Sequence, residues 1–210
     1  IGNRGEGVAM RVAWINGWSL SQAHLRRLAV EFFPESDHIA LSPVPGWDQE
    51  VEALERIDVL IGYSLGAFLL MGRPELKGVA SRTILLAPFE DFRSESDCGG
   101  RIGRGQLVYL SRWLDREAMA AIADFRVRSG LAEPLNDDSE YSLDNLKWGI
   151  ERLMTDSVES GSIDKFECYV GSEDTLLDSS ILKKLYPRIN VIEGAGHDLK
   201  ELLGSGRVSI

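Results

Sequence analysis

The chain has 210 residues and a mass of 23.3 kDa, enough to bury a hydrophobic core within a single domain. Its 23 basic and 33 acidic residues give a net charge of −10, which argues against a protein that binds nucleic-acid phosphates. Two cysteines exclude a disulfide framework, and with three histidines no metal site is expected. No run approaches the roughly 18 apolar residues of a membrane span, and no signal peptide is visible. We therefore expect a cytoplasmic enzyme or binding protein.

Apolar runs bounded by Gly and Pro alternate with helical patterns from residue 10 onward. Residues 1–9, which are polar and rich in glycine, are set aside. The apolar run at 10–15 predicts a buried strand. A helix is predicted over 21–33 from its 3.6-residue apolar period, with a capping-box spacing from Ser19 to Gln22. Further strands are predicted at 38–41, 58–63 and 82–88, and further helices at 48–56 and 64–71.

The alternation stops at residue 93 and resumes after residue 157. Between them only helices are predicted, at 107–114, 116–127 and 143–154. The remaining elements are a strand at 166–171, a helix at 179–185, a strand at 190–193 and a short helix at the end. Strands that alternate with helices predict an α/β fold, a mostly parallel sheet with helices on both faces. We thus expect a core of residues 10–92 and 158–210, and a helical lid formed by residues 93–157.

The segment Gly62-Tyr63-Ser64-Leu65-Gly66 fits the pattern Gly-x-Ser-x-Gly and joins an apolar strand to an apolar helix. A serine in such a turn has a strained backbone, and glycines two residues to either side leave room for the neighbouring chain. The turn would lift the Ser64 hydroxyl above the sheet edge, where it can act as a nucleophile. The alternative is a tight turn that merely contains a serine.

A serine hydroxyl becomes a nucleophile when a histidine removes its proton. His197 directly follows the last predicted strand, which places it at the sheet edge where Ser64 emerges. His24 lies within the first helix, and His38 begins a strand at the opposite edge of the sheet. His197 is therefore the predicted base.

The histidine needs a carboxylate to orient it, and three acidic residues follow the preceding strand. Asp174, three residues past the strand's last glycine, is the predicted acid. Its neighbour Glu173 should point elsewhere, and Asp178 is placed to cap the next helix. The resulting chain order, Ser64, Asp174, His197, is that of the α/β-hydrolases.

The oxyanion that forms when an ester is attacked needs two backbone N–H donors. Leu65, directly after the nucleophile, is predicted to supply one. Trp18, in the loop after the first strand, is predicted to supply the other. Two interpretations of the Trp18 indole stay open: a wall of the acyl pocket, or plain core packing.

Four segments resemble the signatures of the α/β-hydrolase superfamily: Trp14-Ile-Asn-Gly-Trp18, Gly62-Tyr-Ser-Leu-Gly66, Gly171-Ser-Glu-Asp174 and Gly194-Ala-Gly-His197. Within it the chain most resembles the pimeloyl-[acyl-carrier protein] methyl ester esterases of biotin synthesis. The Gly-Trp after the first strand, the helical lid and the segment at 141–150 carry this narrower resemblance. It implies an acyl-enzyme mechanism that requires no cofactor or metal. The chain has Asn16 where that family usually has histidine.

Residues 93–130 hold seven arginines against five acidic residues, a net charge of +2 within an acidic chain. Such a surface can dock an acidic acyl-carrier protein, or it can be an ordinary salt-bridged face. The candidate carrier-binding residues are Arg101, Arg104, Arg112 and Arg116. The predicted function is hydrolysis of a carboxylic ester, with pimeloyl-[acyl-carrier protein] methyl ester as the substrate that the resemblance implies. The alternatives are a general carboxylesterase or thioesterase, and a non-catalytic binding protein with a hydrolase fold.

Overall fold

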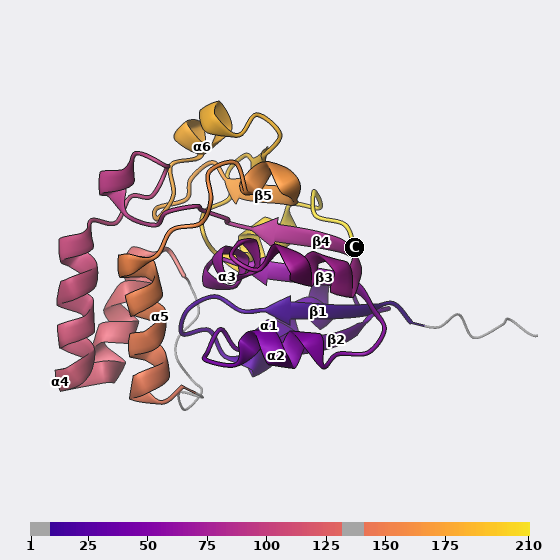
Figure 1. Cartoon of the computed structure of the whole chain (residues 1–210), viewed down its shortest axis with the longest axis horizontal. Coiled ribbons are helices and arrows are strands. Elements are labelled where there is room, and N and C mark those ends of the chain that lie inside the picture. Colours follow the sequence, from indigo (N-terminus) through magenta and orange to yellow (C-terminus); the bar gives the residue numbers. More distant parts are fainter. Residues whose placement is uncertain (1–8, 132–140) are drawn as a thin grey trace, which may run out of the picture.

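A six-stranded sheet forms the centre of the molecule (Figure 1). The computed structural model describes residues 9–131 and 141–210, so residues 1–8 of the segment set aside above lie outside it. All strand pairs are parallel, in the order β2-β1-β3-β4-β5-β6. The predicted parallel α/β sheet is confirmed, and each strand lies within two residues of its expected bounds. The strands are β1 (Arg11–Ile15), β2 (Asp37–Leu41), β3 (Ile57–Tyr63), β4 (Ala80–Leu86), β5 (Glu167–Gly171) and β6 (Asn190–Ile192).

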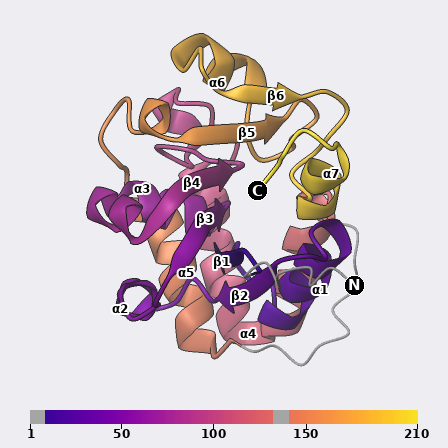
Figure 2. The ribbon, with the colours of Figure 1, turned by 90° about the vertical axis from the view of Figure 1, so that its right-hand side faces the viewer.

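Helices cover both faces of the sheet, as the view along the strands in Figure 2 shows. Helices α1 and α7 lie on one face, and α2 and α3 lie on the other. Because both faces are covered, β1 and β3 are almost entirely buried, which explains their unbroken apolar sequences. Helix α6 packs beside β6. The helices of the core are α1 (Gln22–Phe32), α2 (Trp47–Glu52), α3 (Leu65–Met71), α6 (Ser179–Leu185) and α7 (Leu199–Gly204).

The start of α1 corrects one expectation. Its N-cap is Ser21, whose hydroxyl accepts a hydrogen bond from the backbone N–H of His24 at 3.0 Å. The capping-box role expected for Ser19 is wrong, because this residue has a φ of 60° and still belongs to the turn after β1. The helix predicted over 21–33 is confirmed, but it begins two residues later than a cap at Ser19 predicts.

Two long helices, α4 (Arg104–Arg128) and α5 (Leu143–Thr155), lie between β4 and β5 in the sequence. They pack on each other at the end of the sheet toward which the strand arrows point (Figure 1). Helix α4 bends at Glu117, where φ is −149° and ψ is 68°, so it consists of two helical halves. These halves correspond to the helices predicted at 107–114 and 116–127. Three short 3₁₀ segments, which carry no periodic pattern, were not predicted: Pro74–Val79, Ser94–Ser96 and Ile163–Lys165. None of the described helices is long and apolar enough to cross a membrane.

Candidate active site

Ser64 stands at the junction of β3 and α3 with φ of 53° and ψ of −114°, a conformation that residues other than glycine rarely adopt. The two flanking glycines make this turn possible. A Cβ on Gly62 would lie 2.8 Å from the Cα of Ala67, and one on Gly66 would lie 2.2 Å from the backbone oxygen of Ile15. The turn therefore presents a partly exposed serine at the carboxyl edge of the sheet, as the motif predicts.

His197 lies between the serine hydroxyl and a carboxylate. Its Nε2 is 2.9 Å from Oγ of Ser64, and its Nδ1 is 2.7 Å from Oδ2 of Asp174. Only 3% of His197 and 1% of Asp174 is exposed, so water has little access to this pair. Because a carboxylate accepts hydrogen bonds, Nδ1 carries the proton and Nε2 is left to accept one from Ser64. His38, at the other end of the sheet, instead accepts a hydrogen bond from the indole of Trp14 at 3.1 Å.

Asp174 is held by the backbone of its own loop. Its Oδ1 accepts hydrogen bonds from the two backbone N–H groups of residues 176 and 177, at 2.8 and 2.9 Å. Of the alternative acids, Glu173 is exposed, and Asp178 caps α6 by accepting hydrogen bonds from first-turn N–H groups. Asp174 is thus the acidic side chain of this loop that the fold brings to His197.

Two residues that the sequence analysis did not single out hold the loop of His197. The hydroxyl of Tyr63 donates to the backbone oxygen of His197 at 2.8 Å, and burial raises the pKa of this phenol well above its usual value, which keeps it a donor. Glu201 in α7 accepts a hydrogen bond from the N–H of Gly196 at 2.6 Å. Tyr63 belongs to the Gly-x-Ser-x-Gly motif, so the sequence indicates that it lies beside Ser64. No sequence pattern indicates its hydrogen bond to the backbone oxygen of His197.

Asn16 shapes the loop of the predicted oxyanion donor Trp18. Its fully buried amide donates to the backbone oxygens of residues 20 and 21, at 2.6 and 3.1 Å. The backbone N–H groups of Trp18 and Leu65 donate to no acceptor within residues 9–131 and 141–210. Both predicted oxyanion donors are therefore available to a further oxygen atom, despite the change from histidine to Asn16.

The four arginines predicted to bind a carrier protein have different environments. Arg101 donates from Nη1 to the backbone oxygen of Asp174 at 2.9 Å and from Nη2 to the carboxylate of Asp178 at 3.1 Å. The other three are exposed and pair with no carboxylate of the described residues: Arg104, Arg112 and Arg116. Of the four candidates, Arg101 is also exposed but already occupied by these contacts, whereas the other three leave their guanidinium groups free of carboxylates within the described residues.

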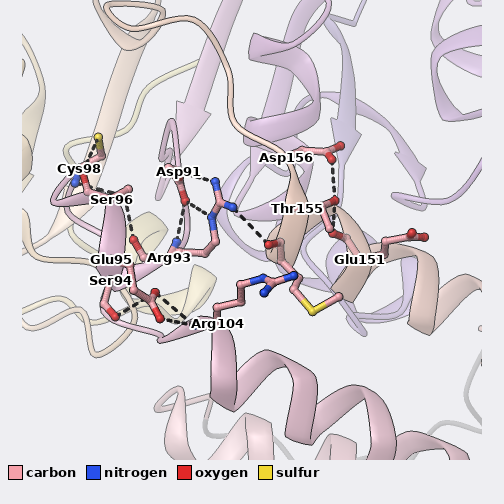
Figure 3. Close-up of polar contacts among 11 residues, drawn as sticks. Asp91, Arg93, Ser94, Glu95, Ser96, Cys98, Arg104, Glu151, Thr155 and Asp156 are labelled. Atoms are coloured by element: carbon pink, nitrogen blue, oxygen red, sulfur yellow. Dashed lines mark hydrogen bonds and ion pairs between the residues drawn. The ribbon is translucent and has the colours of Figure 1, made fainter.

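The two ends of the insertion meet at Arg93 (Figure 3). Its guanidinium binds both carboxylate oxygens of Asp91, at 2.8 and 2.5 Å, and reaches the backbone oxygen of Met154 in α5 at 3.3 Å. Glu95 accepts hydrogen bonds from the N–H of Arg104, the first residue of α4, at 2.9 and 3.1 Å. Charge-assisted hydrogen bonds therefore hold the start of α4 and the end of α5 to the chain that leaves β4.

A cavity of about 260 Å³ lies between the two halves of α4 and the loop of Asp174. Phe125, in its wall, packs edge to face on the indole of Trp18, with ring centroids 4.9 Å apart. Leu176, also in its wall, supplies one of the N–H groups that hold Asp174. The cavity thus borders the acid loop directly and is separated from the loop of Trp18 by the Phe125 ring. Its other apolar lining residues include Ile102, Leu107, Leu110 and Trp113. No group of three or more metal-ligating side chains occurs within the described part of the chain.

No protein-family model and no curated protein sequence matches the chain. Several solved structures do match. An esterase (EaEST) from Exiguobacterium antarcticum is 13% identical, with a TM-score of 0.68 over 91% of this chain and 86% of the esterase. The N-acyl homoserine lactonase AidH, complexed with N-butanoyl homoserine, is 18% identical, with a TM-score of 0.61 over 92% and 84%. BioG from Haemophilus influenzae is 12% identical, with a TM-score of 0.56 over 93% and 90%.

At these identities the likeness establishes the fold. The parallel sheet, the strained serine turn after β3 and the helical insertion after β4 are those of the α/β-hydrolase fold. The chain has this fold, and on it a serine, a histidine and an aspartate are joined by hydrogen bonds.

Proposed function

We propose that the chain is a cytoplasmic serine hydrolase that cleaves a carboxylic ester through an acyl-enzyme. The observation that carries the proposal is the unbroken hydrogen-bond chain from Ser64 through His197 to Asp174, with distances of 2.9 and 2.7 Å. A strained serine and a buried imidazole–carboxylate pair both oppose folding, because positive φ and polar burial are unfavourable. Nucleophilic catalysis by the serine explains why the fold places the strained Ser64 beside the buried His197–Asp174 pair despite these costs.

In the proposed reaction, Oγ of Ser64 attacks the ester carbonyl carbon while Nε2 of His197 takes the hydroxyl proton. Asp174 stabilises the imidazolium that forms, and the backbone N–H groups of Leu65 and Trp18 stabilise the oxyanion. His197 then gives its proton to the departing alcohol, which leaves the acyl group on Ser64. Water, activated by His197 in the same way, attacks this acyl-enzyme and releases the carboxylic acid.

We propose pimeloyl-[acyl-carrier protein] methyl ester as the substrate. Three features that resemble that esterase family support this choice: the Gly-Trp after the first strand, the helical lid and the segment at 141–150. The chain also shares its fold with BioG. The exposed Arg104, Arg112 and Arg116 offer paired donors to the acidic surface of a carrier protein. The mainly apolar cavity of about 260 Å³ beside the acid loop suits the methylene chain of an acyl group.

Release of methanol from the carrier-linked methyl ester, by the wild-type protein and by Ser64→Ala, tests both parts of the proposal. We expect turnover by the wild type and none above background by the variant, and growth of a biotin-requiring strain that lacks its own esterase. Hydrolysis of p-nitrophenyl esters alone would indicate a general carboxylesterase. Release of the acyl group from the carrier would indicate a thioesterase. Turnover of none of these would indicate a binding protein with a hydrolase fold.

A further inference from the structure

The start of the insertion lies against the loop that carries Asp174. Residues 99–101 run antiparallel to residues 176–178, and the two segments share backbone hydrogen bonds of 2.9 and 2.6 Å. On its other side this segment packs on the chain that leaves β4, where a Cβ on Gly100 would lie only 2.1 Å from the backbone oxygen of Phe92, so glycine is required there. The insertion and the acid loop are therefore joined through their backbones.

The side chain of Arg101 adds two contacts to this junction. Its Nη1 donates to the backbone oxygen of Asp174 at 2.9 Å, and its Nη2 donates to Oδ2 of Asp178 at 3.1 Å. One rigid guanidinium thus holds both ends of the acid loop, and each bond is charge-assisted. The first bond connects the insertion to the backbone of the residue that holds His197.

We infer that Arg101 is a positioning residue for the acid, an inference that rests on the proposed function. The side chain of Asp174 is fixed at Oδ1 by two backbone N–H groups, which leaves Oδ2 to meet His197. Those N–H groups belong to the peptide chain that follows the Asp174 carbonyl. When Arg101 holds this carbonyl, it fixes the orientation of the peptide that follows Asp174. The Asp174 side chain lies on one side of that peptide and the two N–H donors follow on the other, so both are positioned by it.

A purely structural role for Arg101 would act through its other contact. Asp178 caps α6, and its pairing with Arg101 ties this helix to the insertion. The two roles use different nitrogens of one guanidinium, so they can be separated. Asp178→Asn removes the ion pair but leaves the bond from Arg101 to the Asp174 carbonyl, whereas Arg101→Met removes both.

Steady-state kinetics on a small neutral ester, with thermal unfolding measured in parallel, distinguishes the two roles. We expect Arg101→Met to lower kcat about 10- to 100-fold with little change in KM, because displacement of a catalytic group by about 1 Å can cost up to about 100-fold. Arg101→Lys, which keeps one cationic donor, should recover part of the loss. Asp178→Asn should lower Tm while kcat stays within about twofold. Equal losses of kcat in Arg101→Met and Asp178→Asn, or an unchanged kcat in Arg101→Met, would overturn the inference.

A second readout does not need ester turnover. The proton between Nδ1 of His197 and Asp174 gives a far-downfield NMR resonance when that hydrogen bond is short and protected from water. We expect this resonance in the wild type and in Asp178→Asn, and its broadening or loss in Arg101→Met. An unchanged resonance in Arg101→Met would overturn the positioning role. If no ester is hydrolysed but the resonance responds as expected, the proposed function fails and the role of Arg101 stands.

Discussion

The indole nitrogen of Trp18 donates a hydrogen bond to the backbone oxygen of Leu146 at 2.9 Å, which ties the loop after β1 to helix α5. The indole also lies against Gly149, where a Cβ would come within 2.6 Å of its Cδ1. The Trp18 side chain therefore joins the core to the insertion. Because the backbone N–H of the same residue is a predicted oxyanion donor, the insertion helps to fix the geometry of that donor.

We predict that Gly149→Ala will both destabilise the protein and slow ester hydrolysis. The new methyl group must displace the Trp18 indole, and overpacking of this kind typically costs about 1–3 kcal/mol. Displacement of the indole would also move the oxyanion donor, so kcat should fall more than KM rises. Gly78→Ala, in the 3₁₀ segment Pro74–Val79, is the control, because its Cβ would meet nothing within 4 Å and it does not line the cavity. Unfolding in urea and kinetics on a small ester measure both effects, and similar behaviour of the two variants would contradict the prediction.

The assignment of the acid predicts that Asp174→Asn lowers kcat about 1,000-fold or more, because an amide no longer selects the tautomer of His197 with a free Nε2. Asp178→Asn removes a carboxylate only four residues away that contacts α6 and Arg101 rather than the histidine. Its kcat should therefore stay close to that of the wild type. A larger loss in Asp178→Asn than in Asp174→Asn would show that the acid is misassigned.

Asp178 should also contribute a pH-dependent part of the stability. Hydrogen bonds from Ser180, then from the N–H of Ile181 and from Arg101, lower its pKa from 3.8 to about 2. A lowered pKa in the folded state means that the contribution is complete above pH 4 and is lost as pH falls through 2. Since this carboxylate is partly exposed, we expect solvent screening to leave about 1 kcal/mol. Urea unfolding of the wild type and Asp178→Asn should therefore give stability differences that shrink between pH 5 and pH 2, and a constant difference would exclude this role.

The carrier-protein hypothesis predicts a salt dependence that differs between substrates. Attraction between exposed arginines and an acidic carrier is screened by salt, so kcat/KM for a carrier-linked ester should fall steeply with ionic strength. The same constant for a small neutral ester should barely change. Replacement of Arg112 and Arg116 by Ala should lower only the carrier-linked rate. If salt changed kcat/KM equally for the two substrates, the carrier-protein hypothesis would be excluded and the protein would be a small-molecule esterase.

Local patterns in the sequence were sufficient to predict the sheet, the serine turn and the order of the site residues. The apolar run of β3 and the close contact of Gly62 with Ala67 involve residues near one another in the sequence, so local patterns indicate them. Gly66 lies against the backbone oxygen of Ile15, and only the Gly-x-Ser-x-Gly pattern indicates its role. The hydrogen bonds that hold the site residues in place, by contrast, join residues far apart in the sequence. Tyr63 reaches a carbonyl 134 residues away, and Arg101 reaches one 73 residues away. The sequence analysis names Arg101 only as a candidate carrier-binding residue, and its contacts with the acid loop could not be predicted, because no periodic pattern encodes pairing across such separations.

The most direct test of the central claim is the site at which a fluorophosphonate probe labels the protein, read by mass spectrometry of the digested chain. The account predicts one modified residue, Ser64, because among the serines in residues 9–131 and 141–210 only this one has a hydroxyl within hydrogen-bond reach of the His197 imidazole. It also predicts that labelling and ester turnover disappear together in Ser64→Ala, while the thermal unfolding transition remains. Labelling at another serine, or undiminished turnover by the variant, would contradict the assignment of this site as the centre of a serine hydrolase.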